Sequence, residues 1–164
     1  MPSTIERSIE IDASPATVWS VLADTAAYAD WNPFMTKLAG NFAVGARLEV
    51  RIEPPEARAM TFKPTVLTAE ADSELRWLGR FLVPGLIDGE HSLRIEPLPD
   101  GRCRFIQSER FSGILVRPLR SMLGKTETGF EQMNASLKER AEALAPVRSE
   151  DVGSTSPNAS NEGV

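Results

Sequence analysis

The sequence predicts an α+β fold in which a curved antiparallel sheet of about six or seven strands wraps a long C-terminal helix. Two short helices are expected after the first strand. Two observations carry this prediction. Apolar and charged residues alternate over 48–53, the period of a strand with one buried face. Near the C-terminus, one apolar stripe runs for about seven helical turns, which a single sheet can cover only by curling around it.

The N-terminal part of the chain predicts a strand and two short helices. Ile5, Ile9 and Ile11 recur among polar residues over 3–12, which indicates a strand. Ser14 and Pro15 begin a helix, because a hydroxyl caps free N–H groups and proline suits the first helical position. Asp24 caps a second short helix, and Pro33 ends it by excluding its predecessor from the helical conformation.

Strands occupy the middle of the chain. Residues 60–66 alternate as 48–53 do, although Pro64 marks an edge position or a bulge. Further strands are expected at 75–83, 86–96 and 102–111. Short strands separated by turn residues indicate an antiparallel meander.

The C-terminal helix is expected to begin near Pro118, and its apolar positions recur at three- and four-residue steps. The stripe comprises Leu119, Met122, Leu123, Thr126, Phe130, Met133, Leu137, Ala141 and Leu144. Charged residues are expected on the opposite face: Lys125, Glu127, Glu131, Lys138 and Glu142. Gly124 and Gly129 each disfavour a helix by about 1 kcal/mol relative to alanine. They indicate either close packing against the sheet or a bend that shapes the mouth of a cavity.

Charge and composition exclude several classes of protein. The net charge of −5 and the dispersed Lys and Arg residues argue against nucleic-acid binding. A single cysteine, Cys103, excludes an intramolecular disulfide and indicates a reducing compartment. The N-terminus lacks the apolar core of a signal peptide, and no segment reaches the ~18 apolar residues of a membrane span. We therefore expect a cytoplasmic protein without membrane insertion, as a monomer or a weak homodimer.

The composition changes at about residue 145. Residues 1–145 form the predicted domain, a size that fits one folded unit. Residues 146–164 are rich in Ser, Asn, Gly and Pro and contain no aromatic residue, so we expect a disordered polar tail.

Two stretches of the sequence carry a family resemblance. The first is IEIDASPATVWSVLADTAAYADWNPF, and the second, GLIDGEHSLRIEPLPDGRCRFIQSERFSGIL, precedes the long helix. From about Thr4 to about Leu144 the chain resembles the START-like (SRPBCC) superfamily, specifically its polyketide cyclase/dehydrase-like branch. The resemblance implies a helix-grip fold with an internal hydrophobic cavity. It is specific for the superfamily and not for one function, because that superfamily includes carriers, cyclases and stress-response proteins.

An inward-facing polar pair is predicted on the last two strands. His91, the only histidine, and Glu109 both lie on the apolar parity of their strands. A type I turn at 98–102, with Gly101 as its left-handed residue, places His91 opposite Glu109. The same register pairs opposite charges on the outer face: Glu96 with Arg104, and Glu90 with Arg110.

The pair permits three interpretations. His91 and Glu109 form a structural hydrogen-bonded pair, they orient a polar group of a bound ligand, or they act as a general acid/base dyad in which Glu109 fixes the tautomer of His91. In the first case the pair is part of the core, and in the other two it belongs to a binding site.

Apolar residues of the expected cavity, which could equally fill a packed core, are Trp31, Phe34, Phe62, Phe105, Phe130 and Met133. Trp77 joins them by the parity of its strand. However, a tight turn at Pro84-Gly85 would place Leu78 and Leu82 on the His91 face instead.

Motifs for cofactors and covalent catalysis are missing from the sequence. It contains no glycine-rich phosphate cradle, zinc ligand set or catalytic triad, so we expect no cofactor or metal, and Cys103 is interpreted as a small buried residue. Three functions fit: a binder of a small hydrophobic or lipid-like ligand, a polyketide cyclase/aromatase-like enzyme, or a protein-interaction module of stress-response type. The enzyme would require His91, Glu109 or Tyr28, and the module an exposed apolar patch.

Overall fold

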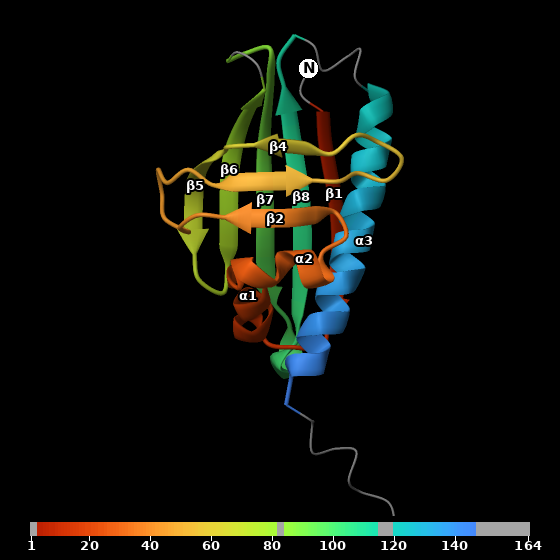
Figure 1. The fold of residues 1–164 in the computed structure, drawn as a ribbon. Helices are drawn as coiled ribbons and strands as arrows, with labels where there is room; N and C mark the ends of the chain where they lie inside the picture. Colours follow the sequence, from red (N-terminus) through yellow and green to blue (C-terminus); the bar gives the residue numbers. More distant parts are fainter. Residues whose placement is uncertain (1–2, 82–83, 115–119, 147–164) are drawn as a thin grey trace, which may run out of the picture.

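The computed structural model describes residues 3–81, 84–114 and 120–146 and confirms the predicted α+β architecture (Figure 1). The predicted tail, 146–164, lies outside these residues except for Pro146. Over the described residues, the elements in chain order are β1 (Ser3–Ile11), α1 (Pro15–Ala23), η1 (Thr25–Ala27), α2 (Tyr28–Trp31), β2 (Met35–Ala39), β3 (Glu49–Ile52), β4 (Met60–Phe62), β5 (Thr65–Glu70), β6 (Glu74–Phe81), β7 (Ile87–Pro97), η2 (Pro99–Gly101), β8 (Cys103–Ser112) and α3 (Arg120–Leu144). None of these helices is long and apolar enough to cross a membrane.

The strands form two antiparallel sheets. The larger sheet has the order β1-β8-β7-β6-β5, and the smaller has the order β2-β3-β4. The smaller sheet crosses in front of the larger one in Figure 1. A bridge between Arg47 and Thr65 connects the segment before β3 to β5, so the two sheets are joined on the β5 side. The sequence predicts one curved sheet and gives no prediction of β2.

Pro64 lies between β4 and β5, where the chain leaves the smaller sheet and enters the larger one. Proline lacks the N–H that a central ladder position requires, which suits it to such a junction. Its carbonyl oxygen accepts a hydrogen bond from Leu48 N at 2.9 Å. The strand predicted over 60–66 is therefore two strands in different sheets.

The short helices position the segment that enters β2. Ser14 caps α1 as predicted, because its Oγ accepts from Thr17 N at 3.1 Å. The prediction for Asp24 was wrong: its side chain makes no capping hydrogen bond. After α2, Asn32 Oδ1 accepts from the backbone N–H groups of Phe34 and Met35, which turns the chain into β2 and holds Phe34 in the core.

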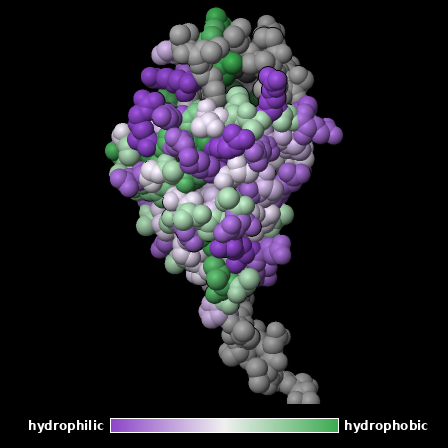
Figure 2. Space-filling model, in the orientation of Figure 1, coloured by the Kyte–Doolittle hydropathy of each residue, from purple (hydrophilic) through white to green (hydrophobic). Residues whose placement is uncertain are grey.

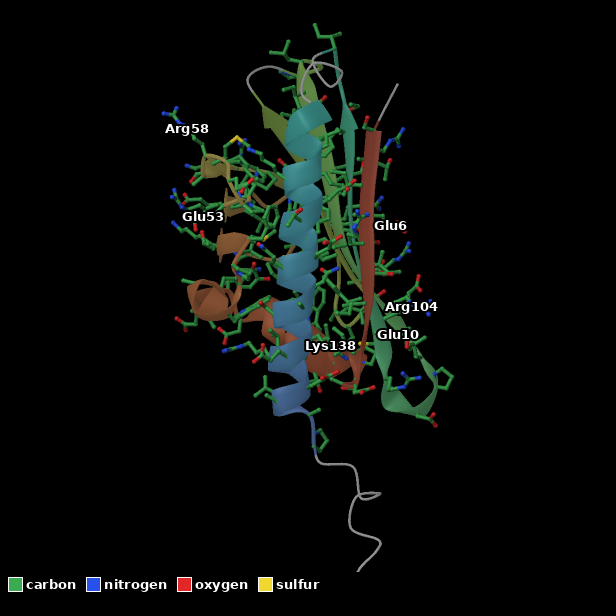
Figure 3. All side chains as sticks on the ribbon, turned by 90° about the vertical axis from the view of Figure 1, so that its right-hand side faces the viewer. Glu6, Glu10, Glu53, Arg58, Arg104 and Lys138 are labelled. Carbon is green, nitrogen blue, oxygen red and sulfur yellow. The ribbon has the colours of Figure 1, made fainter. Side chains whose placement is uncertain are left out.

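The helix α3 lies between the β1 edge of the larger sheet and the smaller sheet (Figure 3). Its buried stripe contains Phe130, Met133, Leu137 and Ala141, as predicted. The stripe is shorter than predicted, since Leu144 is 61% exposed. Pro118 and Leu119 lie outside the described residues. The helix thus closes the side of the molecule that the two sheets leave open.

One flank of α3 is held to β1 by polar contacts. Glu127 and Glu131 both accept from the Arg7 guanidinium, at 2.9 and 2.8 Å. Lys138 Nζ donates to the backbone oxygen of Glu10 at 2.9 Å, and both residues are labelled in Figure 3. These charges were predicted on the face opposite the apolar stripe, whereas in the structure they lie beside it.

The structure explains Gly129, one of the two unusual glycines of α3. A Cβ atom at this position would lie 2.2 Å from Cδ2 of the Phe34 ring, so only glycine admits this ring. Close packing is therefore correct for Gly129, although the partner is the residue before β2 and not the sheet. A Cβ at Gly124 would meet nothing within 4 Å, and the structure does not explain this glycine.

The β7–β8 register is the one predicted. His91 pairs with Glu109, and Leu98 N donates to Arg102 O at 2.8 Å to close the hairpin. The turn itself differs from the predicted type I turn, because Asp100 as well as Gly101 has positive φ. Aspartate tolerates this conformation better than most residues.

Candidate ligand-binding site

His91 and Glu109 meet on the inner face of the larger sheet. Neighbouring strands β7 and β8 place them directly opposite one another, and His91 Nδ1 lies 2.7 Å from Glu109 Oε2. The side chain of His91 is 3% exposed and that of Glu109 is 14% exposed. Each polar group therefore depends on the other for the hydrogen bond that water would otherwise supply.

Gln107 extends this pair into a group of three, which we call the polar cluster: Glu109, His91 and Gln107. Its Nε2 lies 3.2 Å from His91 Nε2 and donates to Met133 Sδ at 3.4 Å. Gln107 is fully buried on β8. Gln107 was not among the site residues predicted from the sequence. Its position on the inner parity, two residues before Glu109, was the signal that could have identified it.

The contacts of the polar cluster define the state of the imidazole. An ionised carboxylate only accepts hydrogen bonds, so His91 Nδ1 carries the hydrogen that Glu109 accepts. The Gln107 amide group donates to Nε2, which requires a free lone pair there. A neutral imidazole with its hydrogen on Nδ1 satisfies both contacts at once.

Aromatic rings surround the polar cluster. Trp77 stacks on His91 with 4.8 Å between ring centroids and 12° between planes, and Phe130 meets the same imidazole edge-on at 5.2 Å. Phe34 packs edge-on against Phe130 at 5.6 Å. The structure therefore brings together His91, Glu109, Trp77, Phe130, Met133 and, through Phe130, Phe34.

The conflict over Trp77 is resolved by the β6–β7 register. Trp77 pairs with His91, and the last pair is Phe81 with Ile87, which leaves a connection of five residues. This register excludes the alternative of a tight turn at Pro84-Gly85 and places Trp77 on the His91 face. Leu82, which that turn would have placed on the His91 face, lies outside the described residues.

The other three predicted cavity residues lie elsewhere in the interior. Phe62 is half-buried, and its ring lies 3.4 Å from where a Cβ on Gly79 would be. Phe105 is fully buried on β8. Trp31 packs on Tyr28 with 5.2 Å between centroids, and its indole nitrogen is buried without a hydrogen-bond partner among the described residues.

Other potentially reactive groups are held in structural roles. Burial raises the pKa of the Cys103 thiol to about 11, so it stays protonated and unreactive at neutral pH. Burial also raises the pKa of Tyr28 above its usual range, and its hydroxyl donates to Leu22 O at 2.7 Å. The described residues contain no group of three or more His, Cys, Asp or Glu side chains that could hold a metal ion.

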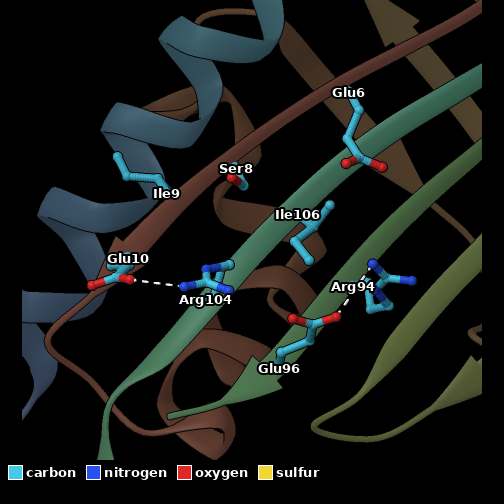
Figure 4. Close-up of a pocket in the computed structure, with 8 residues that line it drawn as sticks. All are labelled: Glu6, Ser8, Ile9, Glu10, Arg94, Glu96, Arg104 and Ile106. Carbon is cyan, nitrogen blue, oxygen red and sulfur yellow. Dashed lines mark hydrogen bonds and ion pairs between the residues drawn. The ribbon is translucent and has the colours of Figure 1, made fainter.

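An open groove of about 540 Å³ lies on the opposite face of the larger sheet (Figure 4). It is lined by Glu6, Ser8, Ile9, Glu10, Arg94, Glu96, Arg104 and Ile106. Arg104 pairs with Glu10 at 3.0 Å and Arg94 with Glu96 at 3.3 Å. Arg94 and Arg104 each already have a carboxylate partner, so neither guanidinium is free to bind an anion in the groove.

A family model matches most of the chain. The model described as "Polyketide cyclase / dehydrase and lipid transport" matches residues 2–142. No curated protein matches the sequence.

Solved structures of the same fold come from plants and bacteria. Norcoclaurine synthase from Thalictrum flavum, a point mutant in complex with a transition-state analogue, is 14% identical with a TM-score of 0.68, covering 88% of this chain and 96% of the synthase. The ZhuI aromatase/cyclase from Streptomyces sp. R1128 is 16% identical with a TM-score of 0.69, covering 87% and 94%. A START superfamily protein from Mycobacterium smegmatis is 18% identical with a TM-score of 0.68, covering 87% and 99%. At these identities the likeness establishes the fold.

Proposed function

Because the chain belongs to the polyketide cyclase/dehydrase and lipid transport family, as its resemblance predicted, we propose that it binds a small, largely apolar ligand in its interior. The ligand lies between the larger sheet, the smaller sheet and α3. The polar cluster orients one polar group of that ligand. The observation that carries this proposal is the burial of three hydrogen-bonded polar side chains among the rings of Trp77, Phe130 and Phe34.

Stability alone gives little reason for such a cluster. Burying a carboxylate and an imidazole has a large desolvation cost, and well-packed apolar residues of similar volume are often as stable or more so. Core positions of this size are usually filled by apolar side chains. A polar cluster enclosed by aromatic rings is what recognition of a mostly apolar molecule requires, because the rings supply contact area and the polar atoms fix orientation.

A second candidate function is proton-transfer chemistry of the cyclase or dehydrase kind. The 2.7 Å contact between His91 and Glu109 has the geometry of a base and its orienting carboxylate. Three features weigh against His91 as the base. Its Nε2 accepts from Gln107, its ring is covered by Trp77 and Phe130, and it is almost fully buried. Glu109 has the more exposed side chain and is the better candidate for moving a proton.

The interaction-module alternative requires a large exposed apolar patch. The large apolar side chains that are exposed among the described residues are Val44, Leu67, Ile114 and Leu144. They come from the 40–47 loop, β5, the segment after β8 and the end of α3. Figure 2 shows hydrophilic and hydrophobic residues intermixed over one face of the molecule. This distribution favours an internal ligand over a protein partner.

The test compares ligand retention with stability. Native mass spectrometry of the protein purified from its own host should detect a bound hydrophobic small molecule. A His91→Phe/Glu109→Leu double variant should lose this molecule while it keeps a wild-type-like melting temperature. The matched control, Arg94→Gln, changes a charge on the outer face of the same strand and should retain the molecule.

The outcomes separate the candidate functions. If wild-type protein carries no small molecule and binds none from an extract of its host, the proposal is wrong. If the molecule is retained by the double variant, the polar cluster is structural. If Glu109→Gln binds the molecule but no longer converts it to a product of different mass, the cyclase or dehydrase function replaces simple binding.

A further inference from the structure

The nitrogen and the oxygen of the Gln107 side-chain amide differ in their hydrogen-bond partners. Its Nε2 contacts both His91 Nε2 and Met133 Sδ, at 3.2 and 3.4 Å. Its Oε1 is buried and has no hydrogen-bond partner among the described residues. Buried carbonyl oxygens in folded proteins are rarely left unpaired, so an orphan of this kind calls for a specific explanation.

Rotating the amide by 180° does not remove the orphan. Rotation would direct the carbonyl oxygen at the lone pair of His91 Nε2 and at the Met133 sulfur, and both are acceptors. A neutral imidazole carries one hydrogen, and when Glu109 accepts it from Nδ1, Nε2 keeps its lone pair. Glu109 thus fixes the tautomer of the imidazole, and the imidazole fixes the orientation of the Gln107 amide. In this orientation Oε1 is left as an unpaired acceptor.

Asn134, the residue after Met133 on α3, is another buried amide with an unpaired acceptor. It is 3% exposed, and its Oδ1 has no partner among the described residues. The carboxylate of Glu109 is an acceptor as well. Glu109 and Gln107 Oε1 therefore offer acceptors to a ligand, and a ligand carboxylate beside them would meet like charge and an unpaired acceptor.

On the basis of the proposed function, we propose that Gln107 determines the ligand specificity of the interior binding site. Its Oε1 accepts a hydrogen bond from a hydroxyl or N–H group of the bound ligand. The ligand class is an apolar molecule that carries such a donor, for example a phenol. Molecules of the same shape whose hydroxyl is capped by a methyl group are bound more weakly, because they leave Oε1 unpaired.

The experiment uses two probes that differ only in this donor. Affinities of the full chain for 2-naphthol and 2-methoxynaphthalene are measured by isothermal titration calorimetry. Wild-type protein should prefer 2-naphthol by about tenfold, the effect of one hydrogen bond that would otherwise be unmade. Gln107→Met keeps the shape of the side chain without its carbonyl, and should reduce the preference to less than about twofold. The control Gln132→Met, at the chain's other glutamine, is exposed on α3 and should retain it.

A measurement on protein with Gln107 intact keeps the proposal testable if Gln107→Met does not fold. In Gln132→Met protein, Gln107 supplies the only glutamine side-chain NH₂ signals, and His91 supplies the only imidazole signals. Nuclear magnetic resonance spectra should show the Gln107 signals shifting more with 2-naphthol than with 2-methoxynaphthalene. The His91 imidazole should keep its Nδ1 hydrogen directed at Glu109 in both complexes.

Three results would overturn the inference: equal affinity of wild-type protein for both probes, an unchanged preference in Gln107→Met, or equal responses of the Gln107 signals. In each of these cases the probes still bind, so the proposed function survives. If wild-type protein binds neither probe nor any small molecule from its host, the proposed function is overturned and this inference with it.

Discussion

The two faces of the β7–β8 hairpin hold polar side chains under opposite conditions. On the inner face, the polar cluster is buried and its members contact one another among aromatic rings. On the outer face, arginines and glutamates are partly exposed, and several pair with neighbouring strands. Examples are Arg104 with Glu10 of β1, and Arg76 of β6 with Glu90.

This difference separates two uses of polarity in one hairpin. Exposed ion pairs are weakened by water and salt, so the identity of each partner matters little. A buried polar group without its partner loses a hydrogen bond that nothing replaces. Substitutions of inner-face polar residues are therefore expected to have larger effects than substitutions of the outer-face charges.

The largest effect is expected from Trp77→Ala. Trp77 is 1% exposed and stacks on His91, so truncation leaves a cavity beside the polar cluster. We expect a loss of about 3–5 kcal/mol in the free energy of unfolding, measured by urea denaturation. The control is Leu78→Ala, the next residue on the outer face of β6, which should cost about 1 kcal/mol. Equal costs for the two variants would show that the faces do not differ as described.

An intermediate effect is expected when Glu109 is replaced by leucine. The Nδ1–H of His91 would be left buried without an acceptor, and we expect the free energy of unfolding to fall by about 1–3 kcal/mol. Adding His91→Phe removes the unpaired donor. The double variant should therefore return to within about 1 kcal/mol of the wild-type value.

A double-mutant cycle on the same variants separates a structural pair from a functional one. Recovery of stability without recovery of ligand binding supports the functional interpretation. A double variant that stays as unstable as Glu109→Leu would show that the fold itself needs the pair. No change in Glu109→Leu would mean that the 2.7 Å contact contributes nothing to stability.

The sequence predicted the parts of the fold that depend on strict periodicity. The stripe of Phe130, Met133 and Leu137 indicated α3, and alternation on β7 and β8 gave the faces of His91 and Glu109. The hairpin register followed from one turn. These features are local, so a single sequence contains them.

The features that the sequence did not predict are irregular or depend on distant contacts. Strand β2 is five residues long, and a register shift between Met35 and Lys37 breaks the alternation by which a strand is identified. The face of β6 on which Trp77 lies was ambiguous in the sequence. It depends on the length of the connection between β6 and β7, which the residues of that connection do not define. The predicted pairing register on the outer face was right. However, Arg104 forms an ion pair with Glu10 of β1, and Glu90 forms one with Arg76 of β6. A prediction made from β7 and β8 alone omits these neighbouring strands.

The smallest effect is expected from Glu10→Gln on the outer face. Hydrogen bonding to Arg104, together with its charge and that of Arg102, lowers the pKa of the exposed Glu10 carboxyl below its usual range. A lowered pKa in the folded state means that the ionised form stabilises the fold above the unfolded-state pKa, and that this contribution disappears as pH falls through the folded-state pKa. Glu10→Gln should thus lower the melting temperature at pH 7 by at most about 2 °C, and this loss should diminish as the pH falls through the folded-state pKa. Glu6→Gln is the control, because Glu6 forms no ion pair with any described residue. If Glu10→Gln lowered the melting temperature at pH 7 as much as Glu109→Leu does, an exposed outer-face pair would matter as much as a buried inner-face pair. That result would contradict the difference between the two faces.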